Sequence, residues 1–231
     1  MPIELTSSKP LEKPLRMVMI SDLHLGYHNT RADLAKWVDK INAERPDAVL
    51  IAGDIVDISV RPLIEENMAE EFHRLNAPIY ACLGNHDYYA RESKARKFFD
   101  DAGITLLRDS SVVIGNNVTV IGRDDRTNVG RKSVAQLMRT VDKNHFTILL
   151  DHQPYNLERA EKAGVDFQFS GHTHYGQVWP ISWIEDAIYE NAYGKSARGN
   201  TQYYVSSGIG IWGAKFRIGT QSEYVVVTLK Q

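Results

Sequence analysis

The chain has 231 residues, of which 43% are hydrophobic and 24% are charged, and its formal net charge is −2. These values are ordinary for a soluble globular protein, and the length suits one domain with an extensive core. Lysines and arginines are scattered among acids, so the sequence shows no obvious nucleic-acid surface. The single cysteine, Cys82, excludes an intramolecular disulfide.

Residues 1–15 are polar and contain three prolines. We expect them to form a polar N-terminal leader, followed by a single domain over residues 16–231. The leader lacks the apolar segment of a signal peptide, and no window approaches the ~20 apolar residues of a membrane span. The chain is expected to be soluble as given. Its location would be cytoplasmic, or membrane-associated if an N-terminal anchor has been removed.

The first half of the chain alternates strands with amphipathic helices. Apolar runs at 16–21, 47–53 and 79–84 predict buried strands. Apolar stripes at helical spacing predict three helices, carried by Leu34, Trp37, Val38 and Ile41, by Ile64, Met68, Phe72 and Leu75, and by Ala95, Phe98, Phe99 and Ala102. This β-α-β-α-β order indicates parallel strands joined by right-handed crossovers.

The second half is richer in strands. Residues 111–122 read as a hairpin around Asn116 and Asn117, and further strands are expected at 146–152 and 165–172. Short helices are predicted over 134–141 and 156–163. Strands are predicted again in three final segments, at 201–208, 215–219 and 223–229. The expected fold is α/β, a layered sandwich of two mixed β-sheets flanked by helices.

Polar residues of unusual type follow the predicted strands. They are Asp22 and His24, Asp54 and Asp57, Asn85 with His86 and Asp87, His152, and finally His172 and His174. Ligand sites of open α/β sheets gather beyond the carboxyl ends of the strands. Five consecutive strand ends therefore deliver carboxylates, amides and imidazoles to one edge of the sheet.

The spacing within two of these groups suggests metal binding. In an extended chain, residues i and i+2 point the same way, so Asp22 with His24, and His172 with His174, are expected to converge on adjacent ions. Any single Asp-x-His is more often a turn or a strand end, but the five clusters together favour a site for two metals. Mixed imidazole and carboxylate donors suit Mn, Fe or Zn better than Ca or Mg.

The ordered motifs Asp22-x-His24, Gly53-Asp54-x-x-Asp57, Gly84-Asn85-His86-Asp87, His152 and Gly171-His172-x-His174 resemble those of the calcineurin-like metallophosphoesterases. The resemblance spans residues 22–174. It implies two divalent ions per chain. It assigns one ion to Asp22, His24, Asp54 and His174, and the other to Asp54, Asn85, His152 and His172, with Asp54 bridging.

The same resemblance assigns His86 to the phosphate and to protonation of the leaving oxygen, with Asp87 orienting its imidazole. Two cations would polarise the phosphoryl oxygens and lower the pKa of a bridging water, which then attacks as hydroxide. Asp57 is expected to support the ligands rather than to bind metal.

Residues 20–26 and 203–229 are also similar to a bacterial phosphodiesterase branch that includes UDP-diacylglucosamine pyrophosphohydrolases. Where that branch has glycine after the second histidine, this chain has Tyr175. Tyr175, Trp183 and Trp212 are therefore candidate substrate-binding residues, although aromatic residues in this region more often close a core.

The predicted function is hydrolysis of phosphodiester or pyrophosphate bonds in a small or lipid-linked, nucleotide-type substrate. Peripheral membrane association is left open, and no protein partner is implied. Two alternatives stand beside this hypothesis. The chain is either a phosphomonoesterase or protein phosphatase, or a scaffold of the same fold without catalysis; the latter is less favoured because every motif residue is present.

Overall fold

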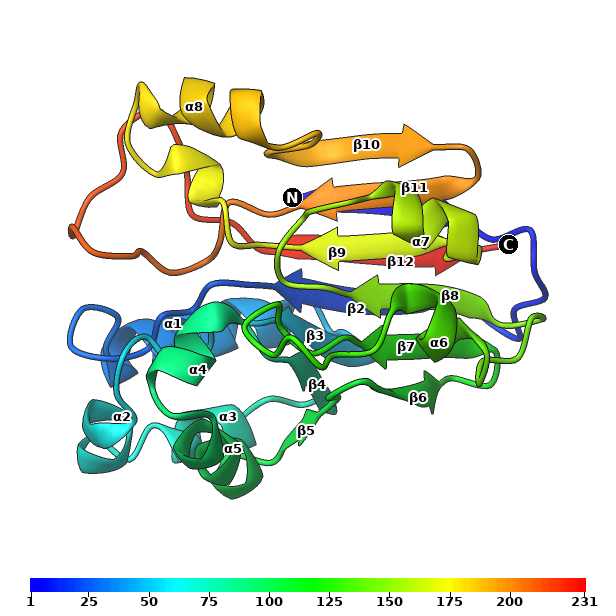
Figure 1. Ribbon diagram of the computed structural model, residues 1–231. Helices are drawn as coiled ribbons and strands as arrows, with labels where there is room; N and C mark the ends of the chain where they lie inside the picture. Colours follow the sequence, from blue (N-terminus) through cyan, green and yellow to red (C-terminus); the bar gives the residue numbers. More distant parts are fainter.

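The computed structural model describes all 231 residues, and they form two six-stranded mixed sheets (Figure 1). The first sheet has the spatial order β1 (Pro2–Thr6), β12 (Val225–Lys230), β2 (Leu15–Ile20), β3 (Ala48–Ala52), β4 (Ile79–Cys82) and β5 (Ile104–Leu106). The second has the order β10 (Gly194–Arg198), β11 (Thr201–Val205), β9 (Phe167–Ser170), β8 (Phe146–Leu150), β7 (Val118–Gly122) and β6 (Ser110–Ile114). The predicted sandwich of two mixed sheets is confirmed.

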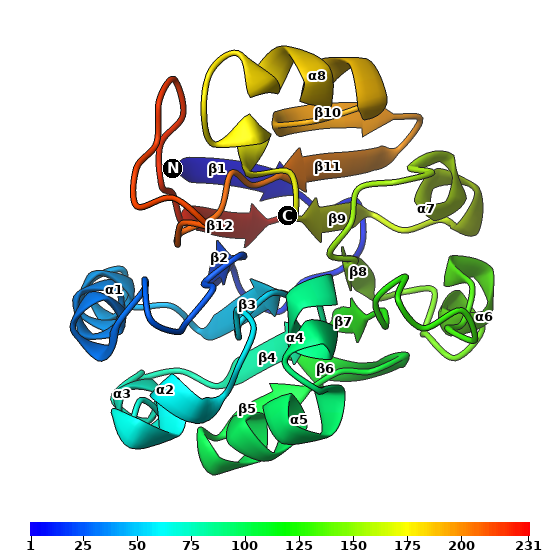
Figure 2. The same ribbon diagram turned by 60° about the vertical axis from the view of Figure 1, so that its left-hand side comes forward.

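Helices cover the outer faces of both sheets (Figure 2). The first sheet is covered by α1 (Arg31–Ala43), α2 (Arg61–Glu65), α3 (Ala69–His73) and α5 (Glu92–Asp101), and the second by α6 (Val134–Met138) and α7 (Glu158–Ala163). Three apolar clusters match these layers. One lies under the helices of the first sheet, one lies between the sheets, and a smaller one lies under α6 and α7.

The helix predicted by the Leu34 stripe is confirmed as α1. Thr30 and Asp33 form a capping box at its start, and Leu34, Val38 and Ile41 are buried. The stripe that begins at Ile64 is instead divided between α2 and α3. Asn67 adopts a positive φ of 52° between them, and Ile64 is exposed, so the prediction of one helix there was wrong.

Residues 1–15 are part of the fold, and the prediction of a leader outside the domain was wrong. Residues 2–6 form β1, which pairs in parallel with β12. Ile3 and Leu5 alternate with polar neighbours and are buried between the sheets. This two-residue alternation is a strand pattern, and the prolines on either side obscured it.

The C-terminal part differs from the prediction in three respects. Residues 215–219 form no strand beyond a single bridge between Val178 and Ile218. The last strand, β12, joins the first sheet beside β2 rather than the second. A helix that the sequence did not suggest, α8 (Ile181–Ile188), lies at the end of the molecule where β9 and β11 terminate (Figure 1).

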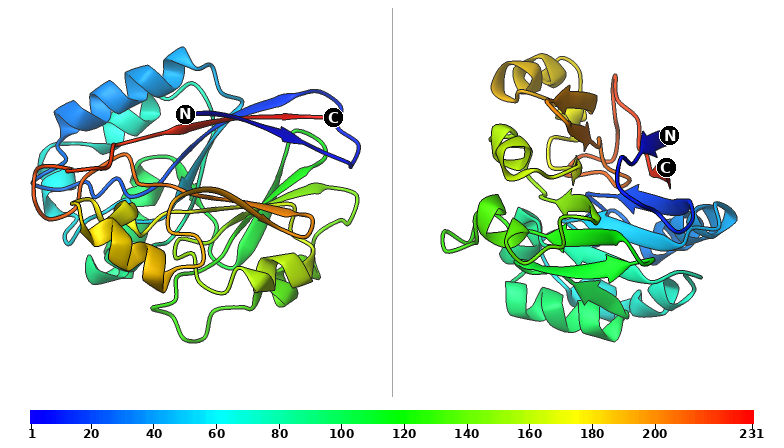
Figure 3. Two further views of the ribbon diagram at one scale, coloured as in Figure 1. Left: turned by 90° about the horizontal axis from the view of Figure 1, so that it is seen from above. Right: turned by 90° about the vertical axis from the view of Figure 1, so that its right-hand side faces the viewer.

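Parallel strands place the functional loops together. β2, β3 and β4 are parallel neighbours, and so are β7, β8 and β9. The arrowheads of β2, β8 and β9 point to the same side in Figure 1, and the view from above in Figure 3 places the loops that follow them at one end of both sheets. The predicted polar clusters therefore meet at the carboxyl ends of strands from both layers.

Candidate metal centre

Five strand ends supply the candidate ligands. Their positions follow β2, β3, β4, β8 and β9, and the loop after β4 continues directly into the short helix α4 (Asn85–Tyr89). The ligands are Asp22, His24, Asp54, Asn85, His152, His172 and His174, and all except His172 are buried. The structure brings all seven to one end of the sandwich.

One group of ligand atoms is formed by Asp22, His24 and His174. The two Nε2 atoms of His24 and His174 face each other at 3.0 Å. The Asp22 Oδ1 atom lies 3.5 Å from His174 Nε2 and 4.0 Å from His24 Nε2. Two imidazole nitrogens and one carboxylate oxygen thus converge on a point that a divalent ion would share.

A second group is formed by Asp54, His152 and His172. The Asp54 Oδ2 atom lies 3.1 Å from His152 Nε2 and 3.7 Å from His24 Nε2 in the first group. One carboxylate oxygen is therefore within reach of both groups, which fits the bridging role expected for Asp54.

Two unpartnered atoms show that the site fits metal ions. Asn85 Oδ1 and His152 Nε2 are buried and make no hydrogen bond. The other ring nitrogen, His152 Nδ1, lies 2.7 Å from the Ala52 carbonyl oxygen, which fixes the proton on Nδ1 and leaves a lone pair on Nε2. Buried acceptors without donors are costly, and a cation satisfies both of them.

The backbone places the ligands differently from the prediction. Five of the seven have positive φ, between 43° and 74°: Asp22, His24, Asp54, His172 and His174. The explanation from an extended chain was therefore wrong, because the chain turns sharply out of each strand. Hydrogen bonds between the loops hold these turns, as in His24 N–H to the Asp54 carbonyl at 3.0 Å and Asp22 N–H to the Gly53 carbonyl at 3.1 Å.

Two glycines permit the close approach of the carboxylates. A Cβ atom on Gly84 would lie 2.1 Å from Asp54 Oδ1, and one on Gly171 would lie 2.2 Å from Asp22 Oδ2. Both distances are far inside van der Waals contact. The glycines of the Gly-Asn-His-Asp and Gly-His-Thr-His motifs are thus required by the carboxylates of the neighbouring strand ends.

Asp57 supports two histidines. Its Oδ1 atom lies 3.3 Å from His24 Nδ1 and 3.1 Å from His86 Nδ1, and its carbonyl oxygen lies 3.1 Å from the same His86 nitrogen. The His24 Nε2 atom is thereby aimed into the centre. Asp57, His24 and His86 also form a third group of candidate ligand atoms, so the interpretation of Asp57 as a residue that does not bind metal stays a prediction.

Asp87 does not orient His86, contrary to the expectation. Its buried carboxylate accepts hydrogen bonds from the backbone N–H groups of Asp54, Val56 and Gly84. The turn into α4 directs Asp87 back toward the loop after β3. Asp87 therefore joins two ligand loops, and Asp57 takes the contact to the imidazole of His86.

Burial lowers the pKa of two of the ligand imidazoles, whereas Asp54 raises the pKa of His152 well above its usual value despite burial. Burial lowers the pKa of His172 to about 4, and the charge of His152 contributes. Burial and His24 lower the pKa of His174 well below its usual value. Burial alone would raise the pKa of Asp54, but the nearby His152, His24 and His86 together depress it. Neutral histidines and ionised carboxylates are the forms that bind metal.

Comparison with known proteins identifies the family. Residues 15–176 match the family described as calcineurin-like phosphoesterase. A metallophosphoesterase from Aquifex aeolicus is 31% identical, over 97% of this chain and 88% of its own length. The chain belongs to the calcineurin-like phosphoesterase family. All seven candidate ligands lie within the matched residues.

Two further proteins that this chain resembles are longer than the chain itself. A metallophosphoesterase from Campylobacter jejuni is 30% identical over 95% of this chain, which spans only 60% of that protein. A 5′-nucleotidase precursor from Thermus thermophilus shares the fold, with a TM-score of 0.56 and 16% identity, over 94% of this chain and 54% of its own. None of the helices in the present chain combines the length and apolarity that a bilayer crossing requires.

The metal site opens into a cavity of about 340 Å³, and only one of the three predicted substrate-binding residues lines it. Trp212 lines it, with its ring 6.1 Å from that of His86. Tyr175 does not: it stacks on Tyr193 and its hydroxyl lies 3.3 Å from Asp186. Trp183 also lies outside the lining, exposed against Trp179. Tyr175 does adopt a positive φ of 48°.

The sequence did not predict several residues that line the cavity, or the arginine that holds the neighbouring segment in place. Tyr89, Ile181 and Glu185 line the cavity. The half-buried Arg217 donates hydrogen bonds to the carbonyls of Gly210 and His174, which fastens the segment 211–219 beside the centre. Only Tyr89 carried a usable signal, because it follows the Gly-Asn-His-Asp motif by two residues on α4.

Proposed function

We propose that the chain hydrolyses phosphodiester or pyrophosphate bonds with two divalent metal ions. The observation that carries this proposal is the position of Asp54 Oδ2, which lies within 4 Å of a histidine nitrogen in each ligand group. Asp22, His24, Asp54 and His174 would hold one ion. Asp54, Asn85, His152 and His172 would hold the other.

The ligand chemistry favours Mn, Fe or Zn, because imidazole, carboxylate and amide donors are mixed and no thiolate is present. Such ions supply Lewis-acid stabilisation of phosphoryl oxygens and activation of water when bound. The chain's own contribution is to fix the donors by the loop contacts and to keep the imidazoles of His172 and His174 neutral.

His86 is the candidate general acid. Its imidazole lines the cavity beside Trp212 and is held by Asp57 rather than by the ligand groups. Burial alone would lower the pKa of His86, but the hydrogen bond to Asp57 and the charge of Asp54 raise it. A protonated imidazole at the mouth of the site is placed to donate a proton to a departing oxygen.

A lipid-linked substrate and peripheral membrane association are supported by the apolar surface beside the cavity. Trp179, Trp183, Ile184 and Ile188 on and near α8 are each more than half exposed, and Ile181 of the same helix lines the cavity. Tryptophan and aliphatic side chains on one surface helix are typical of contact with a bilayer interface.

The membrane proposal is tested by cosedimentation with vesicles of phosphatidylethanolamine and phosphatidylglycerol. The wild type should sediment with the vesicles, and Trp183→Asp should not. Val129→Asp is the matched control, because Val129 is fully exposed and lies outside both α8 and the metal site. Equal binding by all three proteins would refute a specific role for α8.

The reaction is tested with manganese-loaded protein on bis(p-nitrophenyl) phosphate, a pyrophosphate diester and p-nitrophenyl phosphate. The proposal predicts a higher kcat/KM for the diester or the pyrophosphate than for the monoester. A preference for the monoester would indicate a phosphomonoesterase. If metal-loaded protein hydrolyses none of the three, the result would contradict the proposal and support a scaffold of the same fold without catalysis.

A further inference from the structure

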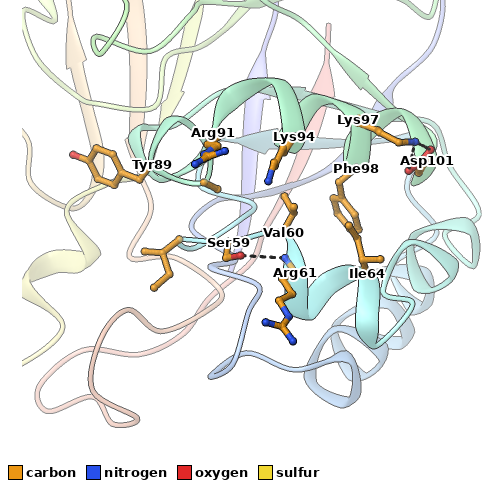
Figure 4. A pocket seen from close by; sticks show the side chains of 12 residues that line it. Ser59, Val60, Arg61, Ile64, Tyr89, Arg91, Lys94, Lys97, Phe98 and Asp101 are labelled. Carbon is orange, nitrogen blue, oxygen red and sulfur yellow. Dashed lines mark hydrogen bonds and ion pairs between the residues drawn. The ribbon is translucent and has the colours of Figure 1, made fainter.

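A second cavity, of about 670 Å³, lies between α5 and the segment from Ile58 to Ile64 (Figure 4). Val60 and Phe98 are buried and form its apolar floor. In Figure 4 the ring of Phe98 points from α5 toward α2, and Lys94 projects from the same helix into the space between them. None of the metal ligands lines this cavity.

The lining of this cavity is strongly cationic. It contains four basic side chains, Arg61, Arg91, Lys94 and Lys97, and one carboxylate, Asp101. The chain as a whole carries a formal charge of −2, so the cations are concentrated here against the overall balance. A surface of one charge sign attracts ligands of the other sign.

Two of these cations are free. Arg61 pairs with Glu65 at 2.6 Å, and Lys97 pairs with Asp101 at 3.1 Å. Arg91 and Lys94 form neither an ion pair nor a side-chain hydrogen bond. Arg91 is the residue just before α5 and Lys94 lies in its first turn, and both line this cavity. Cations near the positive end of the helix dipole do not stabilise the helix. An anion bound by Arg91 and Lys94 at this position would be stabilised by the dipole.

Tyr89 connects this cavity to the metal site. It lines both cavities, and its ring lies 5.1 Å from that of His86. Tyr89 is 60% exposed, so one face of the ring is open to a ligand. The two cavities therefore adjoin at Tyr89.

We propose that this cationic cavity is a substrate subsite for a second phosphate group, separated from the scissile phosphate by an apolar or aromatic spacer. Arg91 and Lys94 bind the second phosphate, and Tyr89 contacts the spacer. The apolar atoms of the spacer pack against Val60 and Phe98. The proposal rests on the proposed function for the position of the scissile phosphate. It adds the substrate class, which is an organic molecule with two separated phosphates.

The test uses α,ω-alkane bisphosphates of increasing chain length, each compared with the alkyl monophosphate of equal length. Calorimetric binding to manganese-loaded protein is the first readout, and competitive inhibition of bis(p-nitrophenyl) phosphate hydrolysis is the second. At the chain length that spans both cavities, the bisphosphate should bind at least about tenfold more tightly than the monophosphate, the scale of a new charge-assisted contact.

The variant Arg91→Gln/Lys94→Gln should reduce this ratio to near one, with unchanged turnover of bis(p-nitrophenyl) phosphate. Arg96→Gln is the matched control, because Arg96 lies on the same helix but lines a different cavity. Arg96→Gln should keep the full ratio. A thermal melt of each variant excludes loss of folding as the cause.

The inference is overturned if no chain length gives a bisphosphate preference in the wild type, or if the preference survives in Arg91→Gln/Lys94→Gln. Failure of the proposed function looks different. In that case the wild type does not hydrolyse bis(p-nitrophenyl) phosphate, whereas the calorimetric difference between the wild type and Arg91→Gln/Lys94→Gln still decides whether the subsite exists.

Discussion

The loops that carry the metal ligands and the surface around α8 lie side by side but are built in opposite ways. Nearly all the ligands are buried, and hydrogen bonds join the loops that carry them, such as those that Asp87 accepts from three backbone N–H groups. The side chains of α8 are largely exposed, and only Ser182 among them is buried. The segment 211–219 is fastened by hydrogen bonds that involve the side chains of Arg217 and Gln177.

This difference separates the chemistry of the site from its specificity. Donors that must meet two ions require fixed positions, and the parallel strand ends of two sheets supply them. A surface that meets the rest of a substrate needs only exposed apolar and charged groups on helices and loops. Substitutions in the ligand loops should therefore change activity far more than substitutions on the rim, and the following predictions run in that order.

The largest effect is expected from Asp54→Ala. Because its Oδ2 atom reaches both ligand groups, its loss should weaken both ions and lower kcat/KM on a diester by roughly a thousandfold or more, the scale of disabling a catalytic unit. Steady-state kinetics with elemental analysis checks this. Asp142→Ala, which removes an exposed carboxylate remote from the centre, should keep both ions. Retention of one full ion in Asp54→Ala would contradict the bridging role.

His86→Ala should separate catalysis from metal binding. The imidazole lies beside the ligand groups but contacts Asp57, so the metal content should remain while turnover falls by roughly a hundredfold or more. Metal analysis and turnover are measured on the same sample. If metal and activity are lost in parallel, His86 is a ligand rather than a proton donor.

Asp57→Asn tests support of the histidines. Because Asp57 contacts both His24 and His86, its replacement should lower metal affinity and turnover by roughly ten- to a hundredfold, the usual scale for a residue that orients a ligand. Added manganese should restore part of the activity. An unchanged metal affinity would show that the contact to His24 has no role in binding.

The smallest effect is expected on the rim, from Trp212→Ala. Its ring borders the cavity beside His86 but is half exposed. KM for an aryl phosphodiester should rise by about fivefold with kcat nearly constant, the scale of one aromatic contact. Tyr175→Phe is the comparison variant and should leave KM unchanged, because Tyr175 lies outside the cavity. A larger fall in kcat than in Asp57→Asn would reverse the order argued here.

The identity of the ligands could be read from the sequence because their residue types and order along the chain are unusual. Their geometry could not. The pairs Asp22 with His24 and His172 with His174 are set by left-handed turns, which arise from contacts between loops of different strands. For the same reason, the contact to His86 that was expected of Asp87 is made by Asp57. Which carboxylate faces the His86 imidazole depends on the direction of the turn into α4, and local spacing does not encode it.

Segments without a periodic signal were the least predictable. The strand β1 is defined by its pairing with β12, more than two hundred residues away in the chain. The helix α8 has apolar residues that face solvent, so a prediction that relies on a buried apolar stripe does not detect it. The stripe of Leu34, Val38 and Ile41 was read correctly because the helix buries the face that the pattern indicates.

The central claim is that the chain holds two ions through one shared carboxylate. The most direct test is elemental analysis after manganese loading and removal of excess metal, for the wild type and Asp54→Ala side by side, with thermal melting as a parallel readout. The account predicts about two ions per chain and a metal-dependent rise in melting temperature for the wild type, with neither in Asp54→Ala. A wild type with one ion or none, or an Asp54→Ala variant that keeps two, would contradict it.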